Sequence, residues 1–164
     1  MDSPPPIEII VARSPHELDA ARALFTEYAE QLGVDLAFQG FGEELAALPG
    51  DYGEPRGTLL LALVDGEVAG CCALRPIDDV DYANAAEMKR LFVRKAFRGF
   101  GLGRQLAEAV LQAALSLGYA CVLLDTLDEM ESARALYEDL GFAEIPPYYH
   151  NPLPGAHYLK ADLA

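Results

Sequence analysis

The segment that most constrains this chain is the hexapeptide Arg98-Gly99-Phe100-Gly101-Leu102-Gly103. It follows a strand-like apolar run and precedes a stretch in which apolar residues recur at helical spacing up to Leu117. Glycines let a ligand approach the backbone closely, and the exposed amide groups at a helix N-terminus favour an anion. The segment therefore predicts a strand–turn–helix unit that cradles a pyrophosphate, although a glycine-rich turn without a ligand has the same pattern.

Basic residues are concentrated in the same part of the sequence. The chain has 12 Lys and Arg residues and a net charge of -14, and half of these basic residues lie between Glu87 and Glu108, where no acidic residue intervenes. They are Lys89, Arg90, Arg94, Lys95, Arg98 and Arg104. We expect this positive charge to gather around the glycine-rich loop, where it would favour a phosphate-bearing ligand.

Composition limits the class of protein. With 164 residues and 52% hydrophobic content, the chain is long enough for one domain with a substantial core, which we place at residues 7–164 after a flexible N-terminus of residues 1–6. An isoelectric point of about 4.4 argues against nucleic acid as a partner. The N-terminus lacks the regions of a signal peptide, and no apolar run reaches membrane-spanning length. We therefore expect a cytoplasmic protein with no membrane partner.

The three cysteines, Cys71, Cys72 and Cys121, lie in strand-like apolar runs and show no metal-ligand spacing. A free thiol in such a run behaves as a small hydrophobic side chain. The sequence therefore predicts reduced, structural cysteines and no metal site.

Hydrophobic periodicity and turn signals divide the chain into alternating strands and helices. A capping box at Ser14 and Glu17 predicts the start of a helix that ends at Gly33, and Asp65-Gly66 predicts a tight hairpin. We expect strands at residues 7–12, 58–64, 67–74, 87–93, 120–126, 142–145 and 156–163, and helices at residues 15–32, within 38–48, and at 102–117 and 131–140. This order predicts an α/β layer with a mixed sheet.

Two common classes of phosphate site do not fit this loop. A dinucleotide fold needs Gly-x-Gly-x-x-Gly after the first strand of a βαβ unit, and a P-loop needs Lys-Ser or Lys-Thr after its last glycine. The spacing here is Arg98-x-x-Gly101-x-Gly103, after a strand in the middle of the chain.

This spacing resembles the signature of the GNAT acetyltransferase superfamily, which is Gln or Arg, two residues, Gly, one residue, then Gly or Ala. The segment from Ala133 to Phe142, which contains Leu136-Tyr137 and ends in Gly141-Phe142, is similar to the second motif of that family. The resemblance covers roughly residues 58–146. It implies a single-domain α/β fold with a mixed, mostly antiparallel sheet flanked by helices.

The resemblance also implies acetyl-CoA as the cofactor and an N-acetyltransferase as the function. Backbone groups of Leu91, Phe92 and Val93 would pair with the pantetheine arm. The turn would hold the pyrophosphate through its amides, with charge added by its arginines. The cofactor-binding residues implied there are Arg98, Gly99, Phe100, Gly101, Leu102, Gly103 and Arg104. Packing in the core is the alternative role for the strand residues.

The reaction implied is direct attack of a neutral amine on the thioester, with strand amides stabilising the tetrahedral oxyanion. Tyr137 is the expected general acid for the departing thiolate; its alternative role is a core aromatic on an apolar helix stripe. Glu87 and Asp125 are the candidate bases for an ammonium acceptor, and either could instead pair with Lys89 or Arg90.

Other features leave alternatives open. Many members of the family have Asn where this chain has Met130, so that pantetheine contact is in doubt. The segment Pro146–His157 could line an acceptor pocket or form a rigid connection, and we interpret His150 as a surface residue. The acceptor could be a small molecule or a peptide amine, and a homodimer is expected because dimers are common in the superfamily. The alternative function is a regulatory module that binds acyl-CoA without efficient catalysis.

Overall fold

The computed structural model describes residues 5–33, 36–127 and 131–163, in which seven strands and four α-helices follow one another in the predicted order. Residues 1–4 of the expected flexible N-terminus and Met130 lie outside this part of the chain. The elements are β1 (Ile7–Val11), α1 (Pro15–Leu32), α2 (Phe41–Ala47), β2 (Thr58–Val64), β3 (Glu67–Ile77), β4 (Ala85–Val93), α3 (Leu102–Ser116), β5 (Cys121–Leu127), α4 (Glu131–Asp139), β6 (Ala143–Ile145) and β7 (Ala156–Asp162).

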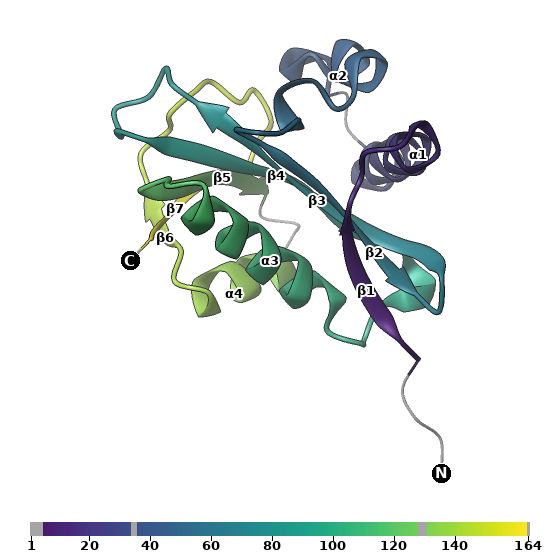
Figure 1. Cartoon of the computed structure of the whole chain (residues 1–164). Coiled ribbons are helices and arrows are strands. Elements are labelled where there is room, and N and C mark those ends of the chain that lie inside the picture. The colour runs from purple at the N-terminus through teal and green to yellow at the C-terminus, as the bar shows by residue number, and fades with distance from the viewer. Residues whose placement is uncertain (1–4, 34–35, 128–130, 164) are drawn as a thin grey trace.

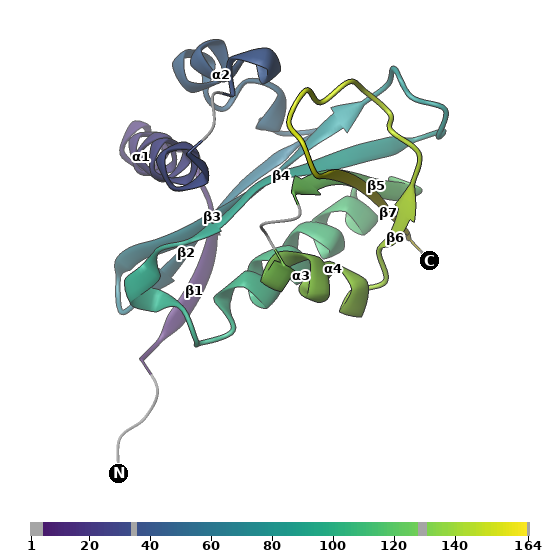
Figure 2. The same ribbon diagram turned by 180° about the vertical axis from the view of Figure 1, so that it is seen from behind.

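All seven strands form one sheet in the order β1-β2-β3-β4-β5-β7-β6. Only β4 and β5 are parallel, and every other neighbouring pair is antiparallel. Helices α1 and α2 lie on one face and α3 and α4 on the other (Figures 1 and 2). The prediction of a mixed, mostly antiparallel sheet flanked by helices is confirmed.

Local sequence signals account for the first half of this arrangement. Ser14 accepts a hydrogen bond from the Glu17 amide, and the Glu17 side chain accepts one from the Ser14 amide, so the predicted capping box starts α1. Gly33 ends that helix with φ of +68°. Asp65 and Gly66, with φ of +51° and +80°, form the hairpin between β2 and β3.

Each face of the sheet has its own core. The larger cluster lies between the sheet and α3 and includes Leu106 and Val110, both fully buried. The cluster on the other face contains Leu24 and Phe25 of α1. The cysteines lie buried and free in β3 and β5, as predicted. In the part of the chain that the structure describes, no helix is long and apolar enough to cross a bilayer.

The parallel pair β4 and β5 positions the candidate site. These strands pair only where Ala85–Glu87 faces Cys121–Leu123, and beyond that point they diverge. Strand β4 also contains a bulge, because Arg90 and Leu91 together stand opposite Cys72 of β3 and Arg90 has φ of +63°. The divergence leaves one edge of β4 unpaired beside the glycine-rich turn, at the centre of the sheet.

Candidate functional site

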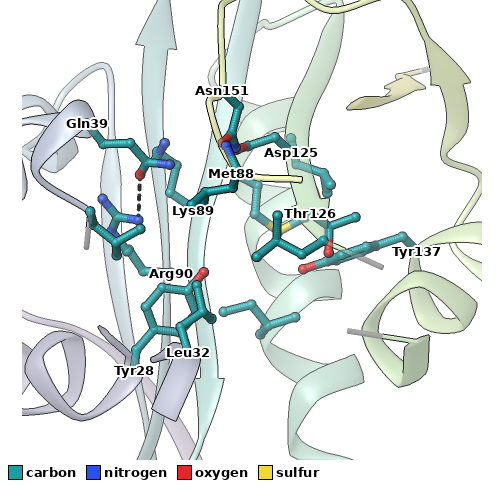
Figure 3. Close-up of a pocket in the computed structure, with 15 residues that line it drawn as sticks. Tyr28, Leu32, Gln39, Met88, Lys89, Arg90, Asp125, Thr126, Tyr137 and Asn151 are labelled. Atoms are coloured by element: carbon teal, nitrogen blue, oxygen red, sulfur yellow. Dashed lines mark hydrogen bonds between the residues drawn. The ribbon is translucent and has the colours of Figure 1, made fainter. Parts of the chain in front are cut away.

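A small cavity of about 40 Å³ occupies the gap where β4 and β5 diverge, and we call it the splay cavity. Its walls come from α1, β4, β5, α4 and the loop before β7, which contribute Tyr28, Lys89, Asp125, Tyr137 and Asn151 among others. Figure 3 shows the Tyr28 and Tyr137 hydroxyls directed toward the space between the strands from opposite sides. Leu36 and Gln39, between α1 and α2, complete the lining, so segments that are far apart in the sequence meet at this gap.

A second cavity of about 250 Å³ adjoins the first on the side of α2, and we call it the α2 cavity. Its lining residues are Gln39, Glu44, Tyr52, Arg75, Ile77, Glu87, Lys89, Tyr148 and Tyr149. Gln39 and Lys89 line both cavities. A molecule in the α2 cavity would therefore lie next to the gap between β4 and β5.

The glycine-rich turn has the open geometry that close approach of a ligand requires. Gly99 and Gly101 have φ of +92° and +76°, and a Cβ atom on either would have no atom of the described residues within 4 Å. Gly101 is the N-cap of α3, so the first amide groups of that helix follow it directly. Space, exposed amides and a helix N-terminus occur together here, which suits a pyrophosphate.

Only half of the basic cluster gathers around this turn, so the prediction is wrong for Lys89, Arg90 and Arg94. Arg90 binds Glu44 with two hydrogen bonds of 2.9 Å, and Arg94 pairs with Glu27 of α1 at 2.6 Å. Lys89 lies in the two cavities. The bulge explains this outcome, because it shifts the strand alternation and directs both Lys89 and Arg90 to the face that carries α1 and α2.

Three basic residues remain near the turn. Arg98 donates hydrogen bonds to the Val93 carbonyl and to Gln31, and Arg104 pairs with Asp139. Both arginines are largely exposed, and Lys95 is exposed as well. Their charge lies at the rim of the predicted phosphate site.

The residues of β4 expected at the cofactor divide between the two faces of the sheet. The Phe92 side chain belongs to the core beneath α1, whereas Leu91 and Val93 pack toward α3. Their side chains therefore have packing roles, and the unpaired edge of the strand leaves backbone groups available to a ligand. The structure is compatible with both expected roles of these residues, which are packing by the side chains and pairing of the backbone with the pantetheine arm.

Tyr137 combines a buried ring with a hydroxyl at the splay cavity. The ring packs edge-on against Phe142 with centroids 5.6 Å apart, and only 6% of the residue is exposed. Burial raises the pKa of the hydroxyl well above its ordinary value. The group is therefore neutral and carries a proton at physiological pH, which a general acid requires.

Glu87 is almost fully buried and has charged partners on two strands. Nε of Arg75 donates a hydrogen bond to Oε1, and its Nη2 lies 2.7 Å from the same oxygen. Tyr148 donates a hydrogen bond of 2.6 Å to Oε2, and the Lys89 ammonium lies 3.9 Å from Oε2. Burial acts to raise the pKa of Glu87, but the charges of Lys89 and Arg75 outweigh it and hold the pKa below its ordinary value. Glu87 lines the α2 cavity and is a fixed, charged carboxylate.

Asp125 lies in the splay cavity. Its Oδ2 accepts hydrogen bonds from the Tyr149 hydroxyl and from the Asn151 side chain, whereas Oδ1 accepts none from the described residues. The Tyr149 backbone carbonyl in turn accepts a hydrogen bond of 2.9 Å from Tyr158. The segment before β7 thus covers the site and orients Asp125, while His150 is exposed as expected.

Sequence reasoning did not assign Lys89 or Arg75 to the site. It left open whether the segment Pro146–His157 lines a pocket or forms a rigid connection, and Tyr148 and Tyr149 of this segment do line the α2 cavity. Lys89 carried the clearest signal, because a lysine among apolar strand residues is seldom buried without a reason. Its 7% side-chain exposure and its place in both cavities come only from the bulge and the packing of α2.

Comparison with known proteins gives concordant results. The Acetyltransferase (GNAT) family matches residues 19–142. An uncharacterized N-acetyltransferase of Schizosaccharomyces pombe is 38% identical over 100% of this chain and 99% of that protein. N-acetylaspartate synthetase of Rattus norvegicus is 34% identical over 68% of this chain but only 37% of that protein. The structure of yncA, a putative acetyltransferase from Salmonella typhimurium with its cofactor acetyl-CoA, superposes with a TM-score of 0.69 at 18% identity, covering 96% of this chain and 94% of that chain.

Proposed function

Because this chain belongs to the GNAT acetyltransferase family, and is therefore an acyltransferase, we propose that it transfers the acetyl group of acetyl-CoA to a primary amine in a ternary complex. The observation that carries the proposal is the gap between β4 and β5, which has the glycine-rich turn at one end and brings Tyr137 and Asp125 to the same cavity. Donor and acceptor would meet there from the two faces of the sheet.

The residues present fit acetyl-CoA as the donor. The unpaired edge of β4 offers backbone groups to an extended arm, much as one strand adds to another. The amides after Gly101 would bind the pyrophosphate, and the arginines at the rim would add charge. The S. typhimurium structure, which contains acetyl-CoA, has the same fold.

The chain's own groups supply a proton path for this reaction. Asp125 would accept a proton from the attacking amine at Oδ1, the oxygen without a hydrogen bond from the described residues. Amide groups of β4 would stabilise the negative charge that develops on the carbonyl oxygen. Tyr137 would then protonate the departing thiolate. Glu87 is the second candidate base, but both of its oxygens already accept hydrogen bonds.

The size of the site favours a small acceptor over a folded protein. The α2 cavity of about 250 Å³ is smaller than the roughly 300–1,000 Å³ of drug-sized ligand sites. The name of the R. norvegicus relative, N-acetylaspartate synthetase, indicates that a related domain acetylates an amino acid. Both points support an amine-bearing small molecule.

The direct test measures thiol release from acetyl-CoA with a panel of primary amines, together with mass spectrometry of the acetylated product. We expect release that depends on an amine and yields a product with one added acetyl group. Binding of acetyl-CoA without release for any amine would contradict the proposal and support the regulatory module instead.

The proposal includes two statements about the whole protein. A cytoplasmic location is supported by three buried free thiols, since reducing compartments maintain such groups. The homodimer expected from the family stays a prediction, which the molar mass in solution measured by light scattering tests.

A further inference from the structure

Lys89 is the least compensated cation of the site. Its side chain is 7% exposed, and its ammonium group donates no hydrogen bond to any of the described residues. The nearest carboxylate oxygen, Oε2 of Glu87, lies 3.9 Å away and already accepts a hydrogen bond from Tyr148. The ring of Tyr149 lies 5.9 Å from the ammonium. A buried ammonium with unused donors is costly unless an acceptor occupies the adjoining space.

The remaining charges around the α2 cavity largely cancel one another. Arg90 uses Nε and Nη2 to bind both oxygens of Glu44. Arg75 binds Glu87 through Nε and Nη2, while its Nη1 lies 3.9 Å from Asp51. The three carboxylates thus balance the charges of Arg75, Arg90 and Lys89. Lys89 differs from the two arginines because its ammonium donates no hydrogen bond to a carboxylate of the described residues. The wall of the cavity is therefore close to neutral, whereas the protein as a whole has a net charge of -14.

Lys89 also has a defined position relative to the proposed chemistry. It lines both cavities, and the splay cavity contains Asp125 and Tyr137 as well (Figure 3). A small molecule that reaches from Lys89 to Asp125 would therefore have a negative group at one end and an amine at the other. Lys89 and Asp125 form no salt bridge with each other, so each can bind one end of such a molecule.

We propose that the acceptor is a small amine that also carries a carboxylate, such as an amino acid, and that Lys89 binds this carboxylate. The proposal rests on the acetyltransferase function proposed above and specifies its substrate class. The carboxylate would accept charge-assisted hydrogen bonds from the Lys89 ammonium. Arg75, whose Nη1 has only a distant carboxylate, would add a second positive charge on the α2 side. With its acid group held in this way, the acceptor would present its amine to Asp125.

The test compares acceptors that differ only in charge. Glycine, L-alanine, L-serine and L-aspartate are each assayed beside the corresponding α-carboxamide for kcat/KM, and their binding to the protein saturated with coenzyme A is measured by calorimetry. We expect wild-type protein to prefer at least one amino acid over its carboxamide by about tenfold or more. Equal affinity for both forms, or a preference for carboxamides, would overturn the proposal.

Variants of Lys89 assign the preference to this residue. Lys89→Met should abolish the preference, and Lys89→Arg, which keeps the positive charge, should retain part of it. Lys160→Met is the matched control, because Lys160 pairs with Asp162 on β7 and lines neither cavity. Lys89 does not bind the carboxylate if Lys89→Met lowers kcat/KM equally for the amino acid and for its carboxamide. The same conclusion follows if the Lys160→Met control also loses the preference for the amino acid.

The binding measurement separates this proposal from the proposed function. Selective binding of an amino acid without turnover would contradict the acetyltransferase activity and leave Lys89 as a carboxylate site. Acetylation of amines with no preference for a carboxylate would support the acetyltransferase activity and contradict the carboxylate site at Lys89. Melting temperatures of all variants show whether a loss of binding reflects unfolding, and Lys89→Arg decides the assignment if Lys89→Met is unstable.

Discussion

At the scale of single residues, the site depends on polar groups whose side chains are otherwise part of the core. Tyr137 is the clearest case, since its ring packs against Phe142 while its hydroxyl faces the splay cavity. Asp125 has one oxygen bound by Tyr149 and Asn151 and the other without a partner among the described residues. Packing therefore holds both groups in place and leaves one reactive atom of each accessible.

Removal of the Tyr137 hydroxyl separates its chemical role from its packing role. Tyr137→Phe keeps the ring, so we expect nearly unchanged melting temperature and acetyl-CoA affinity, with turnover reduced on the order of 10²-fold because the general acid is lost. Steady-state rates with several amines and calorimetry of acetyl-CoA binding provide the measurement. Tyr119→Phe is the control, because that hydroxyl binds the Arg56 carbonyl away from the cavities. Full activity of Tyr137→Phe on every amine would make it a core aromatic.

The two carboxylates can be distinguished by pH. If Asp125 accepts the proton of the amine, Asp125→Asn should lose rate most at low pH, where the acceptor is protonated, and should recover as the pH rises. Glu87→Gln should lower kcat/KM by a factor that varies less with pH, because Arg75 and Tyr148 donate hydrogen bonds to the two Glu87 oxygens. The measurement is kcat/KM against pH for each variant. The opposite pattern would assign the role of base to Glu87.

At the scale of secondary-structure elements, β4 and the start of α3 form the binding surface. The strand has an unpaired edge beyond Glu87, and α3 begins at Leu102 directly after a glycine in the left-handed conformation. The two glycines at Gly99 and Gly101 need positive φ, so a side chain there strains the backbone with or without a ligand. Gly103 lies inside the helix and is the better position for a test.

Gly103→Val should weaken acetyl-CoA binding at least tenfold, or about 1.4 kcal/mol, because a side chain would crowd the phosphates. A Cβ atom at Gly103 meets only Leu136, at 3.9 Å, so we expect the domain to stay folded. Gly42→Val is the matched control, since Gly42 is a helical glycine in α2 with open space around it. Calorimetry measures the affinity for acetyl-CoA, and the melting temperature shows whether each variant is folded. Unchanged affinity in a folded Gly103→Val variant would remove this turn from the site.

At the scale of the whole molecule, charged side chains of β4 connect this strand to elements with which it has no backbone pairing. Glu87, whose partner Arg75 lies opposite it on the paired strand β3, accepts a hydrogen bond from Tyr148 of the C-terminal loop. Arg90 joins β4 to α2 through Glu44, and Arg94 joins it to α1 through Glu27. These contacts hold both helices and the loop over one face of the sheet, so the cavities depend on ion pairs as well as on apolar packing.

Glu87 should make the stability of the fold depend on pH. Its pKa in the folded protein lies below its ordinary value of about 4.5, so its contribution to stability is present above that pH and is lost as the pH falls through the folded pKa. We expect the difference in melting temperature between wild type and Glu87→Gln to shrink from about pH 5 to about pH 3. A constant difference across this range would show that the charge of Glu87 does not contribute.

The sequence by itself determined the order of elements, the capping box at Ser14, the hairpin at Asp65-Gly66 and the glycine-rich turn before α3. These features are local, because hydrogen bonds and allowed dihedral angles within a few residues specify them. The two GNAT motifs also lie within short segments, so the family resemblance could be recognised before the fold was known.

Tertiary structure alone decided which charges meet. The bulge at Arg90 changes the side of the sheet to which the following residues point, and no periodicity in the sequence marks it. Arg90, Arg94 and Lys89 thus lie at Glu44, at Glu27 and in the two cavities, and only the other half of the basic cluster lies at the turn. Asp125 and Glu87 meet tyrosines from a loop more than 20 residues away. Such contacts depend on how strands diverge and which loops cover them, which are properties of the folded chain.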